Sequence, residues 1–156
     1  MAARLFSIFF ILTFLSYGTG SGLVASIADG PEGLAGIFAN RTPFMIGIVL
    51  MAIVHTVFNI GLSVLMFSVL KSFNSYLALG YLCAAVAATL TVAIGALFLA
   101  LLVPLSIAFI DAGTGADYFE TLAVVLQRGG FYGYQFGMTM RGLGGLILCY
   151  VFFTSR

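Results

Sequence analysis

Long apolar stretches separated by short polar segments dominate the hydrophobic pattern of this chain. Four of them, residues 5–27, 43–70, 76–110 and 131–153, are long enough to cross a bilayer as a helix, which takes about 20 residues. Barrel strands would alternate apolar and polar residues, and these stretches do not alternate. Lipid offers no hydrogen-bond partner to a free backbone group, so a membrane span must be an α-helix or part of a closed barrel. With a barrel excluded, the four stretches are expected to be helices. The pattern predicts an all-α bundle of four transmembrane helices.

The polar segments predict where the spans end. Residues 28–33 are dense in turn formers, and residues 40–43 close this loop with a proline suited to a helix start. Residues 71–75 form a tight connection, and residues 111–115 break the chain after the third span. The apolar side chains of residues 117–127 fall near one helical face, which predicts a short interfacial helix. The pair Gly129-Gly130 then separates this helix from the fourth span.

The third stretch is longer than a membrane requires. A helix over residues 76–110 reaches about 52 Å, well past the hydrocarbon thickness. Pro104 marks the point where we expect this helix to kink or to leave the membrane. Strong tilt and a protruding helical end are the two alternatives, between which the sequence does not choose.

Composition agrees with lipid surroundings and excludes a cytosolic globule. Of 156 residues, 62% are hydrophobic and 7% charged, and the mean hydropathy is +1.19. Soluble domains carry about 25% charged residues. The net charge of +1 and the lack of a basic run give no footprint for nucleic acid. No repeat or linker divides the chain, so we expect residues 1–156 to form one membrane-embedded domain whose main partner is the bilayer.

Basic residues predict the orientation. With the N-terminus inside, the cytoplasmic segments hold Arg4, Lys71 and Arg156, and the opposite side holds Arg41, Arg128 and all five carboxylates. Only Lys and Arg count in the positive-inside rule, which places both termini in the cytoplasm. Six tyrosines near the predicted span ends fit an aromatic belt: Tyr76, Tyr81, Tyr118, Tyr132, Tyr134 and Tyr150.

The N-terminal stretch has a second interpretation. Arg4, the apolar run and the segment Ser26-Ile27-Ala28 before Asp29 also fit a secretory signal with a small-residue cleavage site. The run is long for such a signal, which favours a retained transmembrane helix.

Three short segments resemble a known family. They are Ala3-Arg4-Leu5-Phe6, Val69-Leu70-Lys71 followed by Leu77-Ala78-Leu79-Gly80-Tyr81, and the closing segment 150–156. They are similar to the bacterial integral-membrane family named domain of unknown function 4386. The resemblance implies a multi-pass protein of the bacterial inner membrane with no known activity. The chain departs from the family at Ala85 and Ala88, where members tend to carry Arg and Glu, and members tend to continue with further helices.

The fourth span carries the most informative stripe. Gly133, Gly137, Arg141 and Gly145 recur every four residues, so we expect them on one helical face, where small residues let helices approach closely. Arg141 then points toward protein, about 18 Å from the inner edge of the membrane. Two interpretations stay open. Arg141 is a structural cation that reaches outward to Asp111 or Glu120, or it forms an anion or proton site.

The second span offers a matching polar face. Gly47, His55, Asn59 and Ser63 are separated by multiples of four residues, with Met51 between them. His55 lies about 22 Å from the inner edge, close to the predicted depth of Arg141. Such a face lines a wet cavity or proton path, or it holds a neutral histidine in an interhelical hydrogen bond.

The third span carries a ridge of small residues, and the chain has few residue types that ligate metals. Gly80, Ala84 and Ala88 form a packing ridge on the third span. One histidine and two cysteines outside any CxxC pattern predict no protein-built metal site, and without a second histidine we expect no haem held by this chain alone. We therefore expect no cofactor.

Three function classes follow. The sequence favours a non-catalytic accessory or helix-packing subunit, associated with other membrane subunits or with copies of itself. A small solute or ion carrier or channel, with His55, Asn59 and Arg141 lining an outer polar pocket, comes second. A membrane enzyme has the least support, because only His55 and distant carboxylates offer acid–base groups.

Overall fold

The computed structural model describes residues 2–113 and 117–154, and within these ranges the fold is all-α. Four helical segments are long and apolar enough to span a membrane: Arg4–Ala28, Arg41–Leu70, Ser75–Ala112 and Asp117–Thr154. The first is helix α1 (Ala2–Ala28). The second joins α3 (Arg41–Val49), a π-helical turn η1 (Leu50–Val54) and α4 (His55–Leu70). The third joins α5 (Ser75–Ala100) and α6 (Leu102–Ala112), and the fourth is α7 (Asp117–Thr154). The predicted four-span bundle is confirmed.

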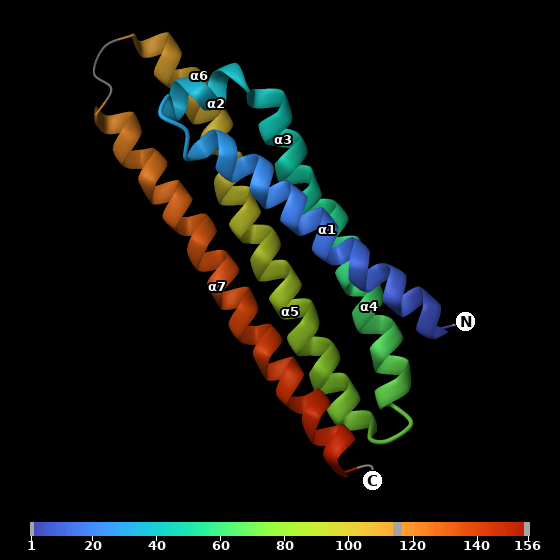
Figure 1. Ribbon diagram of the computed structural model, residues 1–156. Helices are drawn as coiled ribbons and strands as arrows, with labels where there is room; N and C mark the ends of the chain where they lie inside the picture. Colours follow the sequence, from blue (N-terminus) through green and yellow to red (C-terminus); the bar gives the residue numbers. More distant parts are fainter. Residues whose placement is uncertain (1, 114–116, 155–156) are drawn as a thin grey trace.

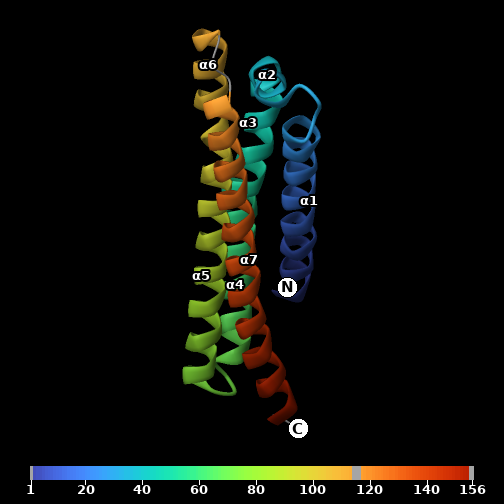
Figure 2. The same cartoon turned by 90° about the vertical axis from the view of Figure 1, so that its left-hand side faces the viewer.

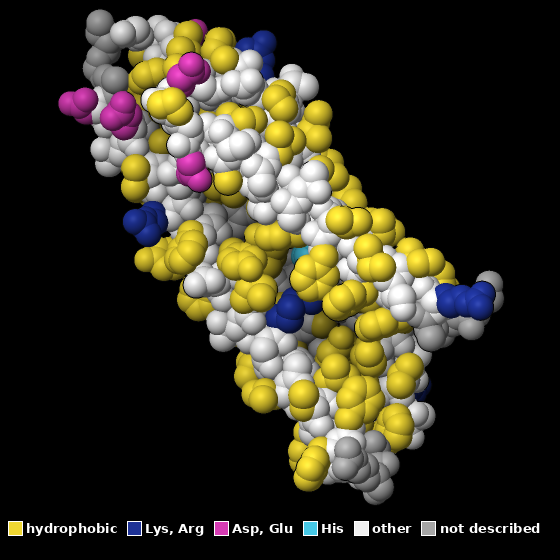
Figure 3. Space-filling view, in the orientation of Figure 1, with side chains coloured by type: hydrophobic (Ala, Val, Ile, Leu, Met, Phe, Trp, Pro, Cys, Tyr) yellow, Lys and Arg dark blue, Asp and Glu magenta, His cyan; other side chains and the backbone are white. Residues whose placement is uncertain are grey.

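The outer surface of these helices is apolar. Phe14, Val57 and Leu146 are 66%, 62% and 68% exposed, and many other large hydrophobic side chains also point outward. Figure 3 shows hydrophobic side chains along the length of one face of the bundle, with acidic ones gathered at the end that holds α6 and the start of α7. An apolar surface of this extent suits lipid rather than water. The four helices and this surface identify an integral membrane protein.

Helices α5 and α7 form the closest pair and run antiparallel along their length (Figure 1). The buried residues of α7 recur every seven positions: Ala123, Gly130, Gly137, Gly144 and Val151. On α5, Ala78, Ala85 and Val92 are buried with the same spacing. A seven-residue repeat is the seam of a left-handed coiled coil. Because most of these residues are Gly or Ala, the two backbones come into direct contact.

Helix α7 is continuous, so the expected separate interfacial helix and the break at Gly129-Gly130 are wrong. The two glycines lie instead against side chains of α5. A Cβ on Gly130 would lie 2.8 Å from Leu99 Cγ, and one on Gly129 would lie 2.8 Å from Phe98 Cδ1. Their small size is used for packing between helices, and α7 keeps its helical hydrogen bonds through both residues.

A short helix, α2 (Gly33–Ala39), occupies the segment expected to be a loop. It packs against α6 at the acidic end of the bundle, and its Ile37 is almost completely buried, as is Leu102 of α6. The third span breaks at Leu101, three residues before Pro104. Pro104 thus lies in the first turn of α6, where a missing N–H is tolerated. The helix is thus interrupted close to Pro104, and α6 continues from the break to pack against α2.

Helix α1 packs on the second span rather than on α7. A Cβ on Gly20 would lie 2.7 Å from the Gly47 carbonyl oxygen, and one on Gly47 would lie 2.8 Å from Val24 Cγ2. Figure 2 shows α1 to one side of the α5–α7 pair, with α3 and α4 behind. The arrangement leaves a space between α1 and α7, and residues of the second and third spans line its inner side.

Candidate functional site

The π-helical turn η1 sets the direction of the polar face of the second span. Residues spaced by four drift by about 40° per step around an α-helix, so a stripe from Gly47 to Ser63 would drift by about 160°. A π-turn has more residues per turn, which compensates much of this drift. All five residues of the stripe are buried: Gly47, Met51, His55, Asn59 and Ser63. The predicted face therefore exists, and η1 ends directly before His55.

His55 is held by two polar neighbours. Its Nδ1 lies 3.2 Å from the Thr13 carbonyl oxygen of α1, and its Nε2 lies 3.2 Å from Asn59 Nδ2. A carbonyl only accepts, so Nδ1–H donates to Thr13, and Nε2 of the neutral imidazole accepts from the Asn59 amide. Ser63 Oγ donates to the Asn59 carbonyl oxygen at 2.8 Å. This network connects α1 to α4 and fixes the tautomer of the imidazole.

His55 and Arg141 line one cavity between four helices. The cavity has a volume of about 350 Å³, which lies within the usual range of small-molecule pockets. Its lining comes from α1, α4, α5 and α7: Phe10, Thr13, Phe14, Tyr17, Gly18, His55, Leu62, Val92, Tyr134, Met138 and Arg141. In Figure 3 this face of the bundle is hollowed, and blue cationic and cyan histidine surface is seen among yellow hydrophobic side chains.

Arg141 supplies a cation without a full set of partners. Its Nη2 is buried and has no hydrogen-bond partner among the residues that the structure describes. The titratable groups with which it interacts electrostatically are Tyr81 and His55, neither of which is an anion at neutral pH. A half-buried guanidinium inside a membrane-spanning helix, with an unused donor, is costly in lipid. The site therefore offers one strong, unoccupied donor to an acceptor placed in the cavity.

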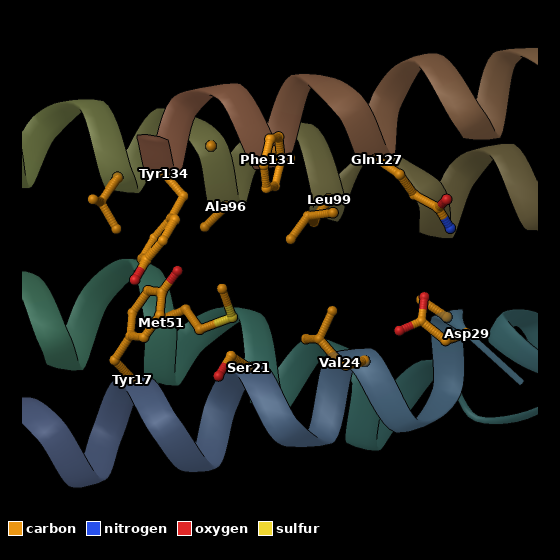
Figure 4. Close-up of a pocket in the computed structure, with 15 residues that line it drawn as sticks. Tyr17, Ser21, Val24, Asp29, Met51, Ala96, Leu99, Gln127, Phe131 and Tyr134 are labelled. Carbon is orange, nitrogen blue, oxygen red and sulfur yellow. The ribbon is translucent and has the colours of Figure 1, made fainter. Parts of the chain in front are cut away.

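A second cavity of about 300 Å³ continues the space between α1 and α7 toward the acidic end. Both cavities are lined by Tyr17, Val92 and Tyr134. The two tyrosine rings stack with centroids 5.6 Å apart and an interplanar angle of 21°. Figure 4 shows Tyr17 and Tyr134 meeting from opposite helices at one end of the second cavity, with Asp29 and Gln127 at the other. The tyrosine pair thus stands between the second cavity and the cavity lined by His55 and Arg141, which we call the inner cavity.

The structure brings some of the predicted site residues together and keeps others apart. His55 and Arg141 share the cavity, and Asn59 contacts it through His55. Glu120 precedes Arg141 by 21 residues on the same helix, about 32 Å along its axis. Asp111 lies in the last turn of α6, at that same distant end of the bundle. The expected pairing of Arg141 with either carboxylate is therefore wrong.

The predicted packing residues divide in a similar way. Gly133 and Gly137 press on α5 backbone, Ala88 is fully buried, and Gly80 and Ala84 contact α7 through Ile147 and Gly144. Gly145 faces open space. The residues of α7 that face α5 recur every seven positions, which places Gly144 on the contact. The four-residue spacing used in the prediction had placed Gly145 there instead.

Several lining residues were not expected from the sequence. Tyr134, predicted for the aromatic belt, stacks on Tyr17 in the bundle, and Tyr17 also lies 5.0 Å from the His55 ring between centroids. The sequence could have indicated that Tyr134 and Met138 lie beside Arg141, because the three residues share one face of α7 at i, i+4 and i+7. The Thr13 carbonyl carried no such signal, because a backbone acceptor is the same at every residue.

Removing the Asn59 amide is expected to destabilise the bundle. Asn59→Leu leaves His55 Nε2 buried without a donor, which costs about 1–3 kcal/mol of unfolding free energy. Ser63→Ala is the control. It removes a hydrogen bond to the Asn59 backbone carbonyl, which remains an acceptor within α4, so the substitution is expected to cost about 1 kcal/mol or less of unfolding free energy. Thermal unfolding of both variants in mild detergent measures the difference. Equal losses would show that the imidazole does not depend on Asn59.

The comparisons with known proteins return a family and no relatives. The family model described as Domain of unknown function (DUF4386) matches residues 5–156. No curated protein and no solved structure matches the chain.

Proposed function

The chain belongs to the DUF4386 family, which has no known activity, and from its site we propose a non-catalytic carrier that binds an anionic ligand inside the membrane. One observation carries this proposal: the Arg141 guanidinium, with Nη2 unpaired, lines an apolar cavity of about 350 Å³. An anionic group placed there satisfies the free donor and offsets the cost of a cation inside the membrane. The polar contacts of His55 are used within the protein, so this residue shapes the cavity wall.

Binding to the purified protein tests the proposal. The protein in lipid nanodiscs is heated with straight-chain carboxylates of four to sixteen carbons and, separately, with the alcohols of equal length. A ligand that binds only the folded state raises its stability, by about 2.7 kcal/mol at one hundred times Kd. We expect at least one carboxylate to raise the melting temperature while its alcohol does not. Equal shifts for each acid and alcohol pair would contradict an anion site.

An accessory subunit is the second candidate, and a different observation favours it. Gly22 on α1 and Gly142 and Gly145 on α7 are positions where an added Cβ would meet no atom within 4 Å. Exposed glycines let another transmembrane helix approach closely. Native mass spectrometry of the protein extracted in mild detergent distinguishes the candidates. A defined complex with other membrane subunits, or a homo-oligomer without ligand binding, favours the accessory role.

The proposed setting is the bacterial inner membrane, with both termini in the cytoplasm. This orientation places the acidic end, with Asp111, outside, and the α4–α5 connection, with Lys71, inside. Single cysteines at Lys71→Cys and Asp111→Cys, in a chain where Cys83 and Cys149 are alanine, test it with an impermeant maleimide. We expect Asp111→Cys to react in intact cells and Lys71→Cys only after lysis. The reverse result would invert the orientation, and reaction of both from one side would contradict the span assignment.

A further inference from the structure

The walls of the inner cavity differ in how far they are open. Toward the acidic end, the stacked rings of Tyr17 and Tyr134 stand between the two cavities. Toward the side of the bundle, the lining residues are themselves on the outer surface: Phe10 is 48% exposed, Phe14 is 66% exposed and Met138 is 44% exposed. The cavity is therefore bounded by the tyrosine pair toward the acidic end and is open sideways, where the surroundings are lipid.

The rim of this lateral opening is apolar throughout. Phe10 and Phe14 stand one turn apart on α1 with ring centroids 4.9 Å apart, and Met138 borders the opening from α7. Gly18, also on the rim, is exposed, and a Cβ there would meet no atom within 4 Å. A small hydrophilic anion would have to leave water and pass this rim, which is unfavourable. A molecule with a hydrocarbon chain already resides on the lipid side.

We propose that the ligand is a single-chain amphiphile with a carboxylate or phosphate head, which enters from the bilayer between α1 and α7. The anionic head pairs with the Arg141 guanidinium, the acceptor that the unused Nη2 requires. The chain lies along Phe10, Phe14 and Met138 and extends through the opening into lipid. This inference rests on the proposed anion site and adds the ligand class and its route.

Photolabelling tests the ligand class. The protein in nanodiscs is labelled with palmitate that carries a diazirine on its chain, in competition with unlabelled palmitate, hexadecyl phosphate, butyrate, inorganic phosphate and hexadecanol. We expect labelling on α1 and α7, and at least tenfold loss of labelling with palmitate or hexadecyl phosphate. The better of these two competitors identifies the head group. Butyrate, inorganic phosphate and hexadecanol at equal concentration are expected to leave labelling unchanged.

Two glycine variants test the route. Gly18→Leu narrows the opening and is expected to reduce labelling at least fivefold. Gly22→Leu is the matched control, because it lies one turn further on the same helix, has equal free space and lines neither cavity. Equal labelling of the two variants would overturn lateral access. The competition series on the unchanged protein does not depend on either variant folding.

The outcomes separate this inference from the proposed function. If butyrate or inorganic phosphate competes as well as palmitate, the anion site stands and the amphiphile is wrong. If hexadecanol competes as well as palmitate, the chain alone binds and the anionic head is wrong. If no anion of any chain length binds, the proposed function itself fails.

Discussion

Replacing Arg141 with leucine is expected to abolish anion binding without destabilising the empty protein. Among the described residues, the guanidinium is the one cationic group that lines the inner cavity, so its loss leaves the bound anion without a partner. Truncating one member of such a buried charged pair costs about 2–5 kcal/mol, which weakens Kd by about 30-fold or more. In the empty protein, Nη2 has no hydrogen bond to lose, and an arginine in the middle of a membrane helix costs about 3 kcal/mol. Leucine therefore keeps or raises the melting temperature.

Two measurements check this expectation. Ligand-dependent thermal shifts give the loss of binding, and thermal unfolding without ligand gives the change in stability. Arg141→Lys is the matched control, since it keeps the positive charge but not the forked donor, and we expect it to bind with intermediate affinity. A large loss of stability in empty Arg141→Leu would show that the guanidinium is a structural partner of the surrounding helices.

Replacing Gly137 with leucine is expected to separate α5 from α7. A Cβ at this position would lie 2.5 Å from Val92 Cγ2 and 2.9 Å from the Ala88 carbonyl oxygen. The backbone carbonyl cannot rotate away as a side chain can, so the helices must move apart. Overpacking of a tight core costs about 1–3 kcal/mol, and we expect the upper end of this range because the seam continues on both sides. The yield of monodisperse protein after extraction falls accordingly.

Gly145→Leu provides the matched control for this substitution. It adds the same side chain to the same helix, two turns further on, where an added Cβ meets nothing within 4 Å. Both variants increase hydrophobicity and helix propensity equally. We expect near-native unfolding for Gly145→Leu and a lowered melting temperature for Gly137→Leu. Similar behaviour of the two would mean that the close approach of α5 and α7 does not limit stability.

The four spans were predictable from the sequence because lipid imposes one simple rule. A helix that crosses the membrane must be apolar over its whole length, and such runs stand out against segments such as 71–75. Elements outside this rule were less predictable. Helix α2 is too short to show a clear period, and its helical state depends on packing against α6. Gly129-Gly130 has the composition of a break, but packing against α5 outweighs the low helix propensity of glycine.

The candidate site was predictable in part. The depths of His55 and Arg141 follow from counting residues along straight helices, and both residues line one cavity. Tyr17 and Thr13 required knowledge of which helices are neighbours, which a single sequence does not contain. The sequence did not show how far Arg141 lies from Asp111 and Glu120. Both carboxylates precede the last span closely in sequence, but Arg141 lies deep within that span, well away from the acidic end.

The π-helical turn η1 gives the second span one more residue than an α-helix of equal height needs. Deleting a residue between Leu50 and Val54 would let the span close as uniform α-helix, and its length would still suffice for the membrane. The part after the deletion would then rotate by about 100° relative to the part before it. His55, Asn59 and Ser63 would swing away from Thr13 as one rigid unit. The orientation of the whole polar face thus depends on a single surplus residue.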